Sequence, residues 1–333
     1  MTINGGLCMK FWIKKLKYLG VKVIPLYLEA KISKDDSNLR LYEQSRYEKM
    51  KLDEIKDFVE SSFKEYTKED LNLDDPQTYD DKIQWMKIFD ATPLKTKLAD
   101  KYLVREYVSE KIGEKYLVPL LGVWDEFDEI DFNSLPNQFA LKANHGSHMN
   151  IIVKDKKTFS REMAKKKFDY WMTMNYAFMG TFEMQYRDIP KKIIGEKYIE
   201  QSNGNLYDYK FDCYNGAAKF CCIIGDRSTC GGYQAFIDLD YKKLNFTDKT
   251  YPIYEELPPK PENWDEMVRI ANILSEGFAF VRVDLYSVQG KIYFGELTFS
   301  PANGLQRWEP KSLDKELGDL ILLPKPYNLK IPQ

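Results

Sequence analysis

The spacing of hydrophobic residues divides the chain into helical and strand-like segments. In residues 51–66 (KLDEIKDFVESSFKEY), apolar side chains recur every three or four positions, which predicts a helix within a charged N-terminal region. The same spacing predicts further helices over residues 79–89, 98–112, 159–174 and 264–274. Apolar or alternating runs predict strands over residues 117–124, 139–143, 150–154, 192–199, 208–214, 219–224, 279–286 and 291–299. Helices mixed with short, mostly antiparallel strands indicate an α+β protein.

Composition narrows the possible partners. The chain has 49 basic and 51 acidic residues, a net charge of −2, so no overall field attracts nucleic acid, and we expect no nucleic-acid partner. The five cysteines lack paired CxxC spacing and only two histidines could assist them, which argues against a zinc site or a disulfide framework. The cysteines are Cys8, Cys213, Cys221, Cys222 and Cys230. This usage fits a reducing, cytoplasmic compartment.

A basic segment near the start introduces a membrane hypothesis. Residues 9–19 (MKFWIKKLKYL) place aromatic and aliphatic side chains among four lysines. This pattern is typical of an amphipathic helix on an anionic bilayer, and equally of a helix packed on its own domain. No run approaches the roughly 20 apolar residues of a spanning helix. We therefore expect a cytoplasmic protein, with contact at the inner face of the membrane as one of the two alternatives.

The last predicted hairpin brings two acids and an arginine to one strand face. In VRVDLY, Arg282 and Asp284 alternate with apolar residues. A three-residue loop at 288–290 would place Arg282 opposite Glu296, with Asp284 diagonal to Glu296 at about 7–8 Å. Two converging carboxylates suit Mg²⁺, which takes one or two carboxylates together with phosphate oxygens and water. The alternative is an Arg282–Glu296 ion pair with Asp284 exposed.

Two other segments carry charge in unusual places. Asp208, Lys210 and Asp212 share one face of the predicted strand 208–214, which is most often a solvated sheet face. Lys142 lies in an apolar strand, where an ammonium is costly unless it meets a negative group. The loop that follows, residues 144–150, contains both histidines of the chain among small residues. It is either a phosphate-binding loop or a turn that tolerates imidazoles.

Four segments in order resemble the ATP-grasp enzymes. They are ADKYLVREYV (99–108), FALKANHGSHMN (139–150), IIGEKYIE (193–200) and FVRVDLY with GKIYFGELTFSP (280–286 and 290–301). Together with DYKF (208–211), they resemble more narrowly the TupA-like ATP-grasp family of surface-polysaccharide biosynthesis, over roughly residues 70–325. The resemblance implies an ATP-grasp fold in which two α+β lobes, residues 76–190 and 191–333, clamp ATP after an N-terminal helical extension, residues 1–75.

The resemblance also implies roles for individual residues. Catalytic roles fall to Arg282, Lys142 and His145, with His145 facing the phosphates. ATP contacts fall to Lys101, Lys142, Gly146, Ser147, Glu196, Lys197, Tyr198, Ile199, Asp208 and Lys210. Of these, Glu196 and the backbone of residues 197–199 would meet adenine, and Asp208 the ribose. Mg²⁺ would be held by Asp284, Glu296 and Thr298. Thr298 replaces the usual asparagine, which puts a second metal in doubt, and His148 replaces a usual glycine.

The activity implied by the resemblance is ATP-dependent ligation of a carboxylate to an amine through an acylphosphate. The carboxylate would be a uronic acid of a surface-polysaccharide precursor, and the required cofactors would be ATP and Mg²⁺. A glycosyltransferase or a sugar kinase of the same pathway, and a nucleotide-binding module without catalysis, are the alternatives. Residues that bind the acceptor have no motif; Arg187, Arg307 and Trp308 are the candidates.

Overall fold

The computed structural model describes residues 34–199, 206–226 and 232–328, which contain two antiparallel sheets. The first sheet has the order β1-β4-β2-β3 and comprises β1 (Leu120–Trp124), β2 (Phe139–Ala143), β3 (Asn150–Val153) and β4 (Ile193–Lys197). The second has the order β7-β6-β5-β8-β9 and comprises β5 (Asp208–Tyr214), β6 (Ala217–Gly225), β7 (Tyr233–Ile237), β8 (Phe280–Val288) and β9 (Lys291–Thr298). The α+β prediction is confirmed.

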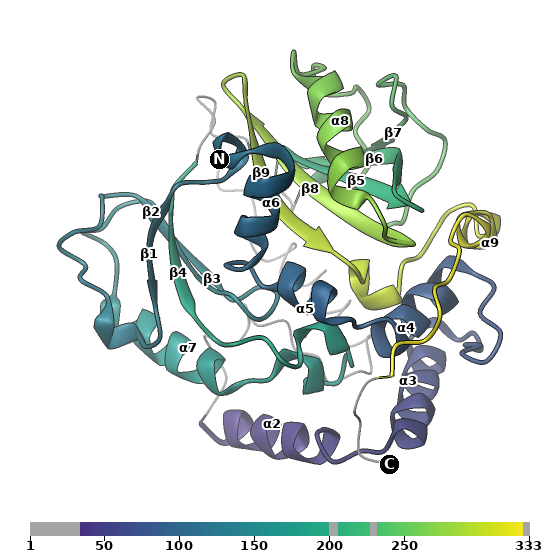
Figure 1. The fold of residues 1–333 in the computed structure, drawn as a ribbon, viewed down its shortest axis with the longest axis horizontal. Coiled ribbons are helices and arrows are strands. Elements are labelled where there is room, and N and C mark those ends of the chain that lie inside the picture. The colour runs from purple at the N-terminus through teal and green to yellow at the C-terminus, as the bar shows by residue number, and fades with distance from the viewer. Residues whose placement is uncertain (1–33, 200–205, 227–231, 329–333) are drawn as a thin grey trace, which may run out of the picture.

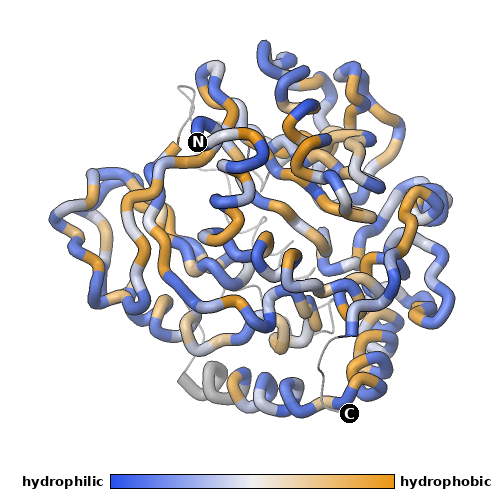
Figure 2. The backbone as a smooth tube through the Cα atoms, in the orientation of Figure 1, coloured by the Kyte–Doolittle hydropathy of each residue, from blue (hydrophilic) through white to orange (hydrophobic). Residues whose placement is uncertain are grey.

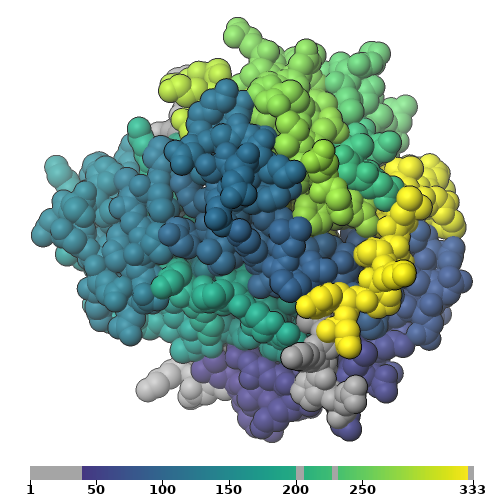
Figure 3. All heavy atoms as spheres, viewed as in Figure 1, coloured from purple at the N-terminus to yellow at the C-terminus, as the bar shows by residue number. Residues whose placement is uncertain are grey.

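Two short helices lie between the sheets. These are α5 (Pro93–Ala99) and α6 (Val104–Ile112), which Figure 1 shows between the first sheet on the left and the second sheet above. In the space-filling view of Figure 3, residues of these helices fill the region between the two sheets on the face shown. The chain between α5 and α6 is therefore placed to contact both sheets.

Other helices cover the outer faces of the sheets. α7 (Arg161–Thr173) packs Phe168 and Trp171 against Phe139 and Leu141 of β2. α8 (Trp264–Ser275) covers one face of the second sheet, where the rings of Trp264 and Phe211 lie 5.2 Å apart. Since side chains alternate along a strand, the residues that flank Phe211 point to the opposite face.

That opposite face is apolar at one end and charged at the other. Its apolar end packs against α4 (Tyr79–Phe89) and α9 (Ser312–Asp319) through a cluster that includes Tyr79, Tyr214, Phe280 and Trp308. Trp308 is buried there among aromatic rings, so its expected place near the acceptor is wrong. The charged end of this face lies toward the first sheet and its loops.

The N-terminal helices attach to the first lobe. α2 (Lys34–Tyr47) and α3 (Leu52–Thr67) lie together below the sheets in Figure 1. Hydrophobic and hydrophilic residues alternate along α3 in Figure 2, and its buried residues Ile55, Val59 and Phe63 join the cluster that contains Phe182. The predicted helix over residues 51–66 is confirmed, whereas the basic segment 9–19 lies outside the described residues. None of the helices in the described ranges has the length and apolarity needed to cross a bilayer.

The helix predicted over residues 98–112 is confirmed only from Val104 onward, as α6, because α5 ends at Ala99 and a turn separates the two helices. The carboxylate of Asp100 accepts hydrogen bonds from the backbone N–H groups of Tyr102 (2.7 Å) and Leu103 (3.2 Å), as in an Asx turn. The other predicted helices and strands lie within a few residues of their predicted positions, while α2, α5, β7 and α9 were not predicted. β4 falls in the range expected for the second lobe, residues 191–333, but it pairs with β1 and β2 of the first sheet.

Candidate functional site

The turn between α5 and α6 holds the loop that follows β2. Lys101 Nζ donates a hydrogen bond to the carbonyl oxygen of Gly146 at 2.5 Å, and the backbone N–H of Lys101 donates to Asn144 O at 3.2 Å. The side chain of Asn144 in turn accepts from the backbone N–H of Lys192 at 2.7 Å. These bonds fix the loop at the edge of the first sheet and bring Lys101 to it.

Lys142 and Glu196 form a charged group on the first sheet. Lys142 Nζ donates to Glu196 Oε2 at 2.6 Å, and Arg105 Nη1 of α6 lies 3.2 Å from Glu196 Oε1. Glu196 is buried, so its charge is balanced by one cation from β2 and one from α6. Lys142, whose ammonium group was predicted to be costly in an apolar strand without a negative partner, therefore has that partner in Glu196.

His145 does not face the cleft. Its ring is buried, and Nε2 donates to the carbonyl oxygen of Trp171 in α7 at 3.0 Å. Burial lowers the pKa of His145 to about 4, so the ring is neutral at pH 7. The predicted phosphate-facing role of His145 is wrong for this arrangement; the side chain instead anchors the loop to α7.

The following residues have the geometry of a tight loop. A Cβ on Gly146 would lie 2.8 Å from Cδ2 of Tyr176, so a side chain has no room there. Ser147 is half-buried and shares a hydrogen bond with the Tyr176 hydroxyl. His148 is exposed and has φ of 60°, the left-handed region in which glycine is unstrained. This explains why glycine is usual at the position in the family that the loop resembles.

The register of the β8–β9 hairpin differs from the prediction. Val288 pairs with Lys291, so the turn contains two residues, Gln289 and Gly290, both with positive φ. A bulge at Gly295 then shifts the register, since a bulge places two residues opposite one. The predicted pairing of Arg282 with Glu296 is wrong.

The shift places the two acids directly opposite each other. Asp284 pairs with Glu296, and Arg282 pairs with Thr298. Arg282 binds Asp284 in two-point fashion, Nε to Oδ1 and Nη2 to Oδ2, both at 2.7 Å, and Lys210 of β5 also binds Asp284. Asp284 is buried, so the alternative with an exposed Asp284 is also wrong.

Electrostatic coupling across the cleft joins the two sheets. Burial and Asp284 raise the pKa of the Glu296 carboxyl, but Lys101, Lys210 and Arg282 together hold it below its usual value. Conversely, burial lowers the pKa of Lys101, while Glu296 raises it and Lys142 lowers it. Lys101, Lys142, Asp284 and Glu296 therefore lie close enough to act on one another, and Lys210 on the charged face of β5 belongs to the same group.

One backbone donor in the segment expected to meet adenine is already hydrogen-bonded. The backbone N–H of Lys197 donates to Pro119 O at 2.9 Å, so this donor is already used within the first lobe. Tyr198 and Ile199 are half-buried and follow the end of β4. Asp208, the first residue of β5, is buried on the same strand face as Lys210. Glu196 and Asp208 therefore come from the two different sheets.

The arrangement and the sequence agree with one family. The family model described as TupA-like ATPgrasp matches residues 81–322, which is most of the chain. The chain belongs to the TupA-like ATP-grasp family. No curated protein matches it.

Several solved enzymes are similar to this chain at low identity. D-alanine–D-alanine ligase from Bacillus anthracis, solved with ATP, is 14% identical over 61% of this chain and 55% of its own, with a TM-score of 0.37. L-amino acid ligase from Bacillus licheniformis is 13% identical over 64% of this chain and 46% of its own, with a TM-score of 0.37. N5-carboxyaminoimidazole synthetase from Staphylococcus aureus, solved with ADP, is 12% identical over 68% and 53%, with a TM-score of 0.37. The TupA-like chain thus spans about half the length of these ligases, and similarities of this size say nothing about its activity.

The acids of this ATP-grasp site fit a magnesium ion that is held largely by phosphate. Within the described ranges, no group of three or more His, Cys, Asp or Glu side chains could hold a metal on its own. Asp284 and Glu296 supply a carboxylate pair; the Glu296 side chain is 45% exposed, whereas both oxygens of Asp284 are bound by Arg282 and one also by Lys210. The hydroxyl of Thr298 donates to Glu296 Oε1 at 3.0 Å and accepts from Arg282 Nη2 at 3.2 Å. Thr298 therefore orients the carboxylate rather than adding a third oxygen ligand.

Two carboxyl groups of this TupA-like site were not predicted as site residues. Asp212, on the charged face of β5, is buried opposite Arg282, and burial raises its pKa to about 7. Glu183 comes from a segment without regular helix or strand, and burial and the charge of Glu296 raise its pKa. Alternation along β5 could have identified Asp212, but nothing in the local sequence identifies Glu183.

Of the expected acceptor residues, Arg307 stacks on Tyr66 and donates to Tyr66 O at 2.6 Å, so its guanidinium is bound to α3.

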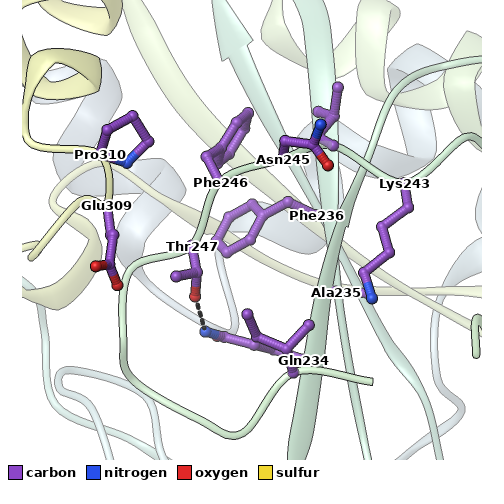
Figure 4. Close-up of a pocket in the computed structure, with 11 residues that line it drawn as sticks. Gln234, Ala235, Phe236, Lys243, Asn245, Phe246, Thr247, Glu309 and Pro310 are labelled. Carbon is purple, nitrogen blue, oxygen red and sulfur yellow. Dashed lines mark hydrogen bonds between the residues drawn. The ribbon is translucent and has the colours of Figure 1, made fainter. Parts of the chain in front are cut away.

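A cavity of about 360 Å³ lies elsewhere, at the β7 edge of the second sheet (Figure 4). Its lining includes Gln234, Phe236, Phe246, Thr247 and Glu309. The amide of Gln234 donates to Thr247 Oγ1 at 3.0 Å and to Asp248 Oδ1 at 2.8 Å. This polar group in the wall of the cavity is therefore already hydrogen-bonded within the protein. None of the residues predicted for ATP or metal lines this cavity.

Proposed function

We propose that this chain is an ATP-dependent ligase that joins a carboxylate to an amine through an acylphosphate. We further propose that the carboxylate belongs to a uronic acid of a surface-polysaccharide precursor, as the family resemblance implies. The observation that carries the proposal is the convergence of Lys101, Lys210 and Arg282 on Glu296, since these cations come from both sides of one cleft. Such an arrangement suits a triphosphate, whose charge must be neutralised during transfer.

ATP binding would exchange partners within the charged groups. Lys142 would leave the carboxylate of Glu196 for phosphate oxygens, and Arg105 would keep Glu196 balanced from α6. Lys101, already at Gly146 O, would hold the loop over the phosphates. Glu196 would then be free to accept a hydrogen bond from the amino group of adenine.

Arg282 is placed to act on the transferring phosphoryl group. Its guanidinium stays charged and is held by Asp284 and Thr298, so it is oriented before the substrate arrives. Mg²⁺ would be held by Asp284 and Glu296 and would neutralise phosphate charge. A carboxylate oxygen of the donor attacks the γ-phosphorus and ADP leaves. The amine nitrogen then attacks the acyl carbon, and the C–O bond to phosphate breaks.

The decisive experiment follows ATP in the presence of candidate substrates. The protein is incubated with ATP, Mg²⁺, glucuronic or galacturonic acid, and alanine or ethanolamine, and the products are identified by mass spectrometry. A ligase gives ADP, phosphate and an amide in equal amounts. A phosphorylated sugar without phosphate release would instead identify a sugar kinase. Nucleotide binding without turnover would identify a non-catalytic module, and sugar transfer from a nucleotide sugar without ATP a glycosyltransferase.

A further inference from the structure

A buried carboxyl group that is acted on by the charge of Glu296 is given no role in the proposed phosphoryl transfer. Glu183 is only 7% exposed and precedes the short helix Met184–Tyr186. Ser300 Oγ donates to Glu183 Oε1 at 2.5 Å, and Gln185 Nε2 donates to Ser300 Oγ at 2.9 Å. Ser300 stands four residues after Glu296, just past the end of β9. These bonds tie Glu183 to the strand that carries the proposed metal ligand.

The groups that surround Glu183 come from four parts of the chain. Lys87 of α4 acts on it electrostatically, and so do Glu296 of β9 and the hydroxyl groups of Tyr176 and Tyr186. Lys87 Nζ is itself buried and donates to Asn303 Oδ1 at 2.7 Å. The two tyrosine rings pack edge to face with centroids 5.0 Å apart, and both are half-buried. Glu183 is therefore acted on by one cation, Lys87, and by one other acid, Glu296.

The backbone at Glu183 is held in an unusual conformation. The preceding residue, Phe182, has φ of 51°, which is rare for a bulky side chain. Phe182 is fully buried, and its ring packs against Tyr47 and Phe58 at centroid distances of 5.5 and 5.3 Å. Aromatic packing thus holds the strained residue and fixes where Glu183 points. Strain of this kind persists where the surrounding structure compensates for it.

We propose that Glu183 is the general base that removes a proton from the amine acceptor, which is a primary alkylammonium. This inference rests on the proposed ligase function. An alkylammonium has a pKa near ~10, so at pH 7 its nitrogen carries three protons and has no free electron pair. One proton passes to the Glu183 carboxylate, the neutral amine attacks the acyl carbon, and the C–O bond to phosphate breaks. A second proton leaves nitrogen with the departing phosphate, and the charges balance.

The environment of Glu183 makes its carboxylate a stronger base than an exposed glutamate. Burial raises the pKa of the Glu183 carboxyl above its usual value, and the hydrogen bond from Ser300 and the charge of Lys87 lower it only in part. A base is most effective when its pKa approaches the working pH. The carboxylate also offers the ammonium a negative partner in an otherwise buried place. Lys87 is a positioning residue in this account, because it acts on the acceptor only through Glu183.

The experiment compares two nucleophiles on the same enzyme. Hydroxylamine is a weak base that is already unprotonated at neutral pH, so it intercepts the acylphosphate without a general base and gives a hydroxamate. Ethanolamine is protonated and needs the base. Each is supplied with ATP, Mg²⁺ and glucuronic or galacturonic acid to wild type, to Glu183→Gln and to the control Glu276→Gln, an exposed acid that binds Lys111 away from the cleft.

We expect the ratio of amide to hydroxamate to fall about 100-fold in Glu183→Gln and to stay at the wild-type value in Glu276→Gln. Ser300→Ala offers a second, milder test. It removes a hydrogen bond that lowers the pKa of Glu183, so the acidic limb of amide formation should move to higher pH while that of hydroxamate formation stays in place. An unchanged ratio together with unmoved limbs would overturn the base assignment alone. Absence of hydroxamate from wild type would overturn the ligase function, and the base assignment with it.

Discussion

The buried Arg282–Asp284 pair can be tested against an exposed pair of the same geometry. In both Arg282–Asp284 and Arg269–Glu266, Nε and Nη2 of the arginine bind the two carboxylate oxygens at 2.7 Å. The side chains of Arg282 and Asp284 are 16% and 3% exposed, whereas those of Arg269 and Glu266 are 52% and 35% exposed. The substitutions Asp284→Asn and Glu266→Gln each remove one negative charge and keep the shape. The two carboxylates differ in burial and in their second partner, which is Lys210 for Asp284 and the hydroxyl of Tyr116 for Glu266.

The expected cost follows from what each arginine retains. Removing one partner of a buried ion pair costs about 3–5 kcal/mol, because the other charge is left uncompensated. Arg282 keeps Glu296, with Nη2 and Oε1 3.7 Å apart, so we place Asp284→Asn at the lower end, about 3 kcal/mol. The exposed pair is screened by water, and Glu266→Gln should cost about 0–1 kcal/mol.

Equilibrium urea unfolding of the nucleotide-free protein at pH 7 measures both free energies. If the two variants lose the same stability within about 1 kcal/mol, the reasoning from burial is wrong. The pH dependence adds an internal check. Arg282 and Lys210 outweigh burial and hold the pKa of Asp284 below its usual value, so its stabilisation is present above about pH 4 and is lost as pH falls through the native pKa. The gap between wild type and Asp284→Asn should therefore narrow in acid as pH falls below about 4.

Three further predictions concern other parts of the chain. Lys142→Ala should reduce ATP turnover at least about 100-fold, with a native circular dichroism spectrum; turnover within a few-fold of wild type would remove Lys142 from the site. Since burial lowers the pKa of His145 to about 4, the unfolded chain binds more protons between about pH 4 and 6.5, and acidification should cost about 3 kcal/mol that His145→Gln no longer shows. Urea midpoints at several pH values measure this, and equal slopes would contradict it. Reversing the charges of Lys14, Lys15 and Lys17 should abolish sedimentation with anionic liposomes, and the membrane hypothesis fails if sedimentation is unchanged.

Local patterns predicted those elements whose boundaries are set by local chemistry. The helix at residues 79–89 matches α4 because Thr78 caps it by accepting a hydrogen bond from the backbone N–H of Asp81. The hairpin register failed because a glycine within a strand gives no sign of which residues will form a bulge. A Cβ on Gly295 would lie 3.0 Å from the carbonyl oxygen of Asp284, so the close approach requires glycine, but the sequence alone offers several glycines. A one-residue shift in the register decides which side chains of β8 and β9 lie opposite each other.

His145 and Glu183 are residues whose positions could not be predicted from the local sequence. The loop sequence suggested that an imidazole among small residues would face a ligand, yet the ring enters the core because Trp171 O offers it a buried acceptor. That acceptor is 26 residues away and has no local signature. Glu183 meets Ser300 across 117 residues, so its place beside Glu296 depends on the packing of both lobes. Residues joined only by tertiary contacts cannot be assigned from spacing.

The charged face of β5 shows that alternating charges along a strand are interpreted more accurately together with the neighbouring strand. Asp208, Lys210 and Asp212 looked like a solvated strand face, but Asp208 and Asp212 are buried and Lys210 binds Asp284. Alternate positions of β8 carry the complementary charges, because Lys210 pairs with Asp284 and Asp212 with Arg282. A solvated face has no reason to match charge on the next strand. Opposite charges at paired positions of two neighbouring strands therefore indicate a face that another lobe covers, and here that face is the floor of the cleft.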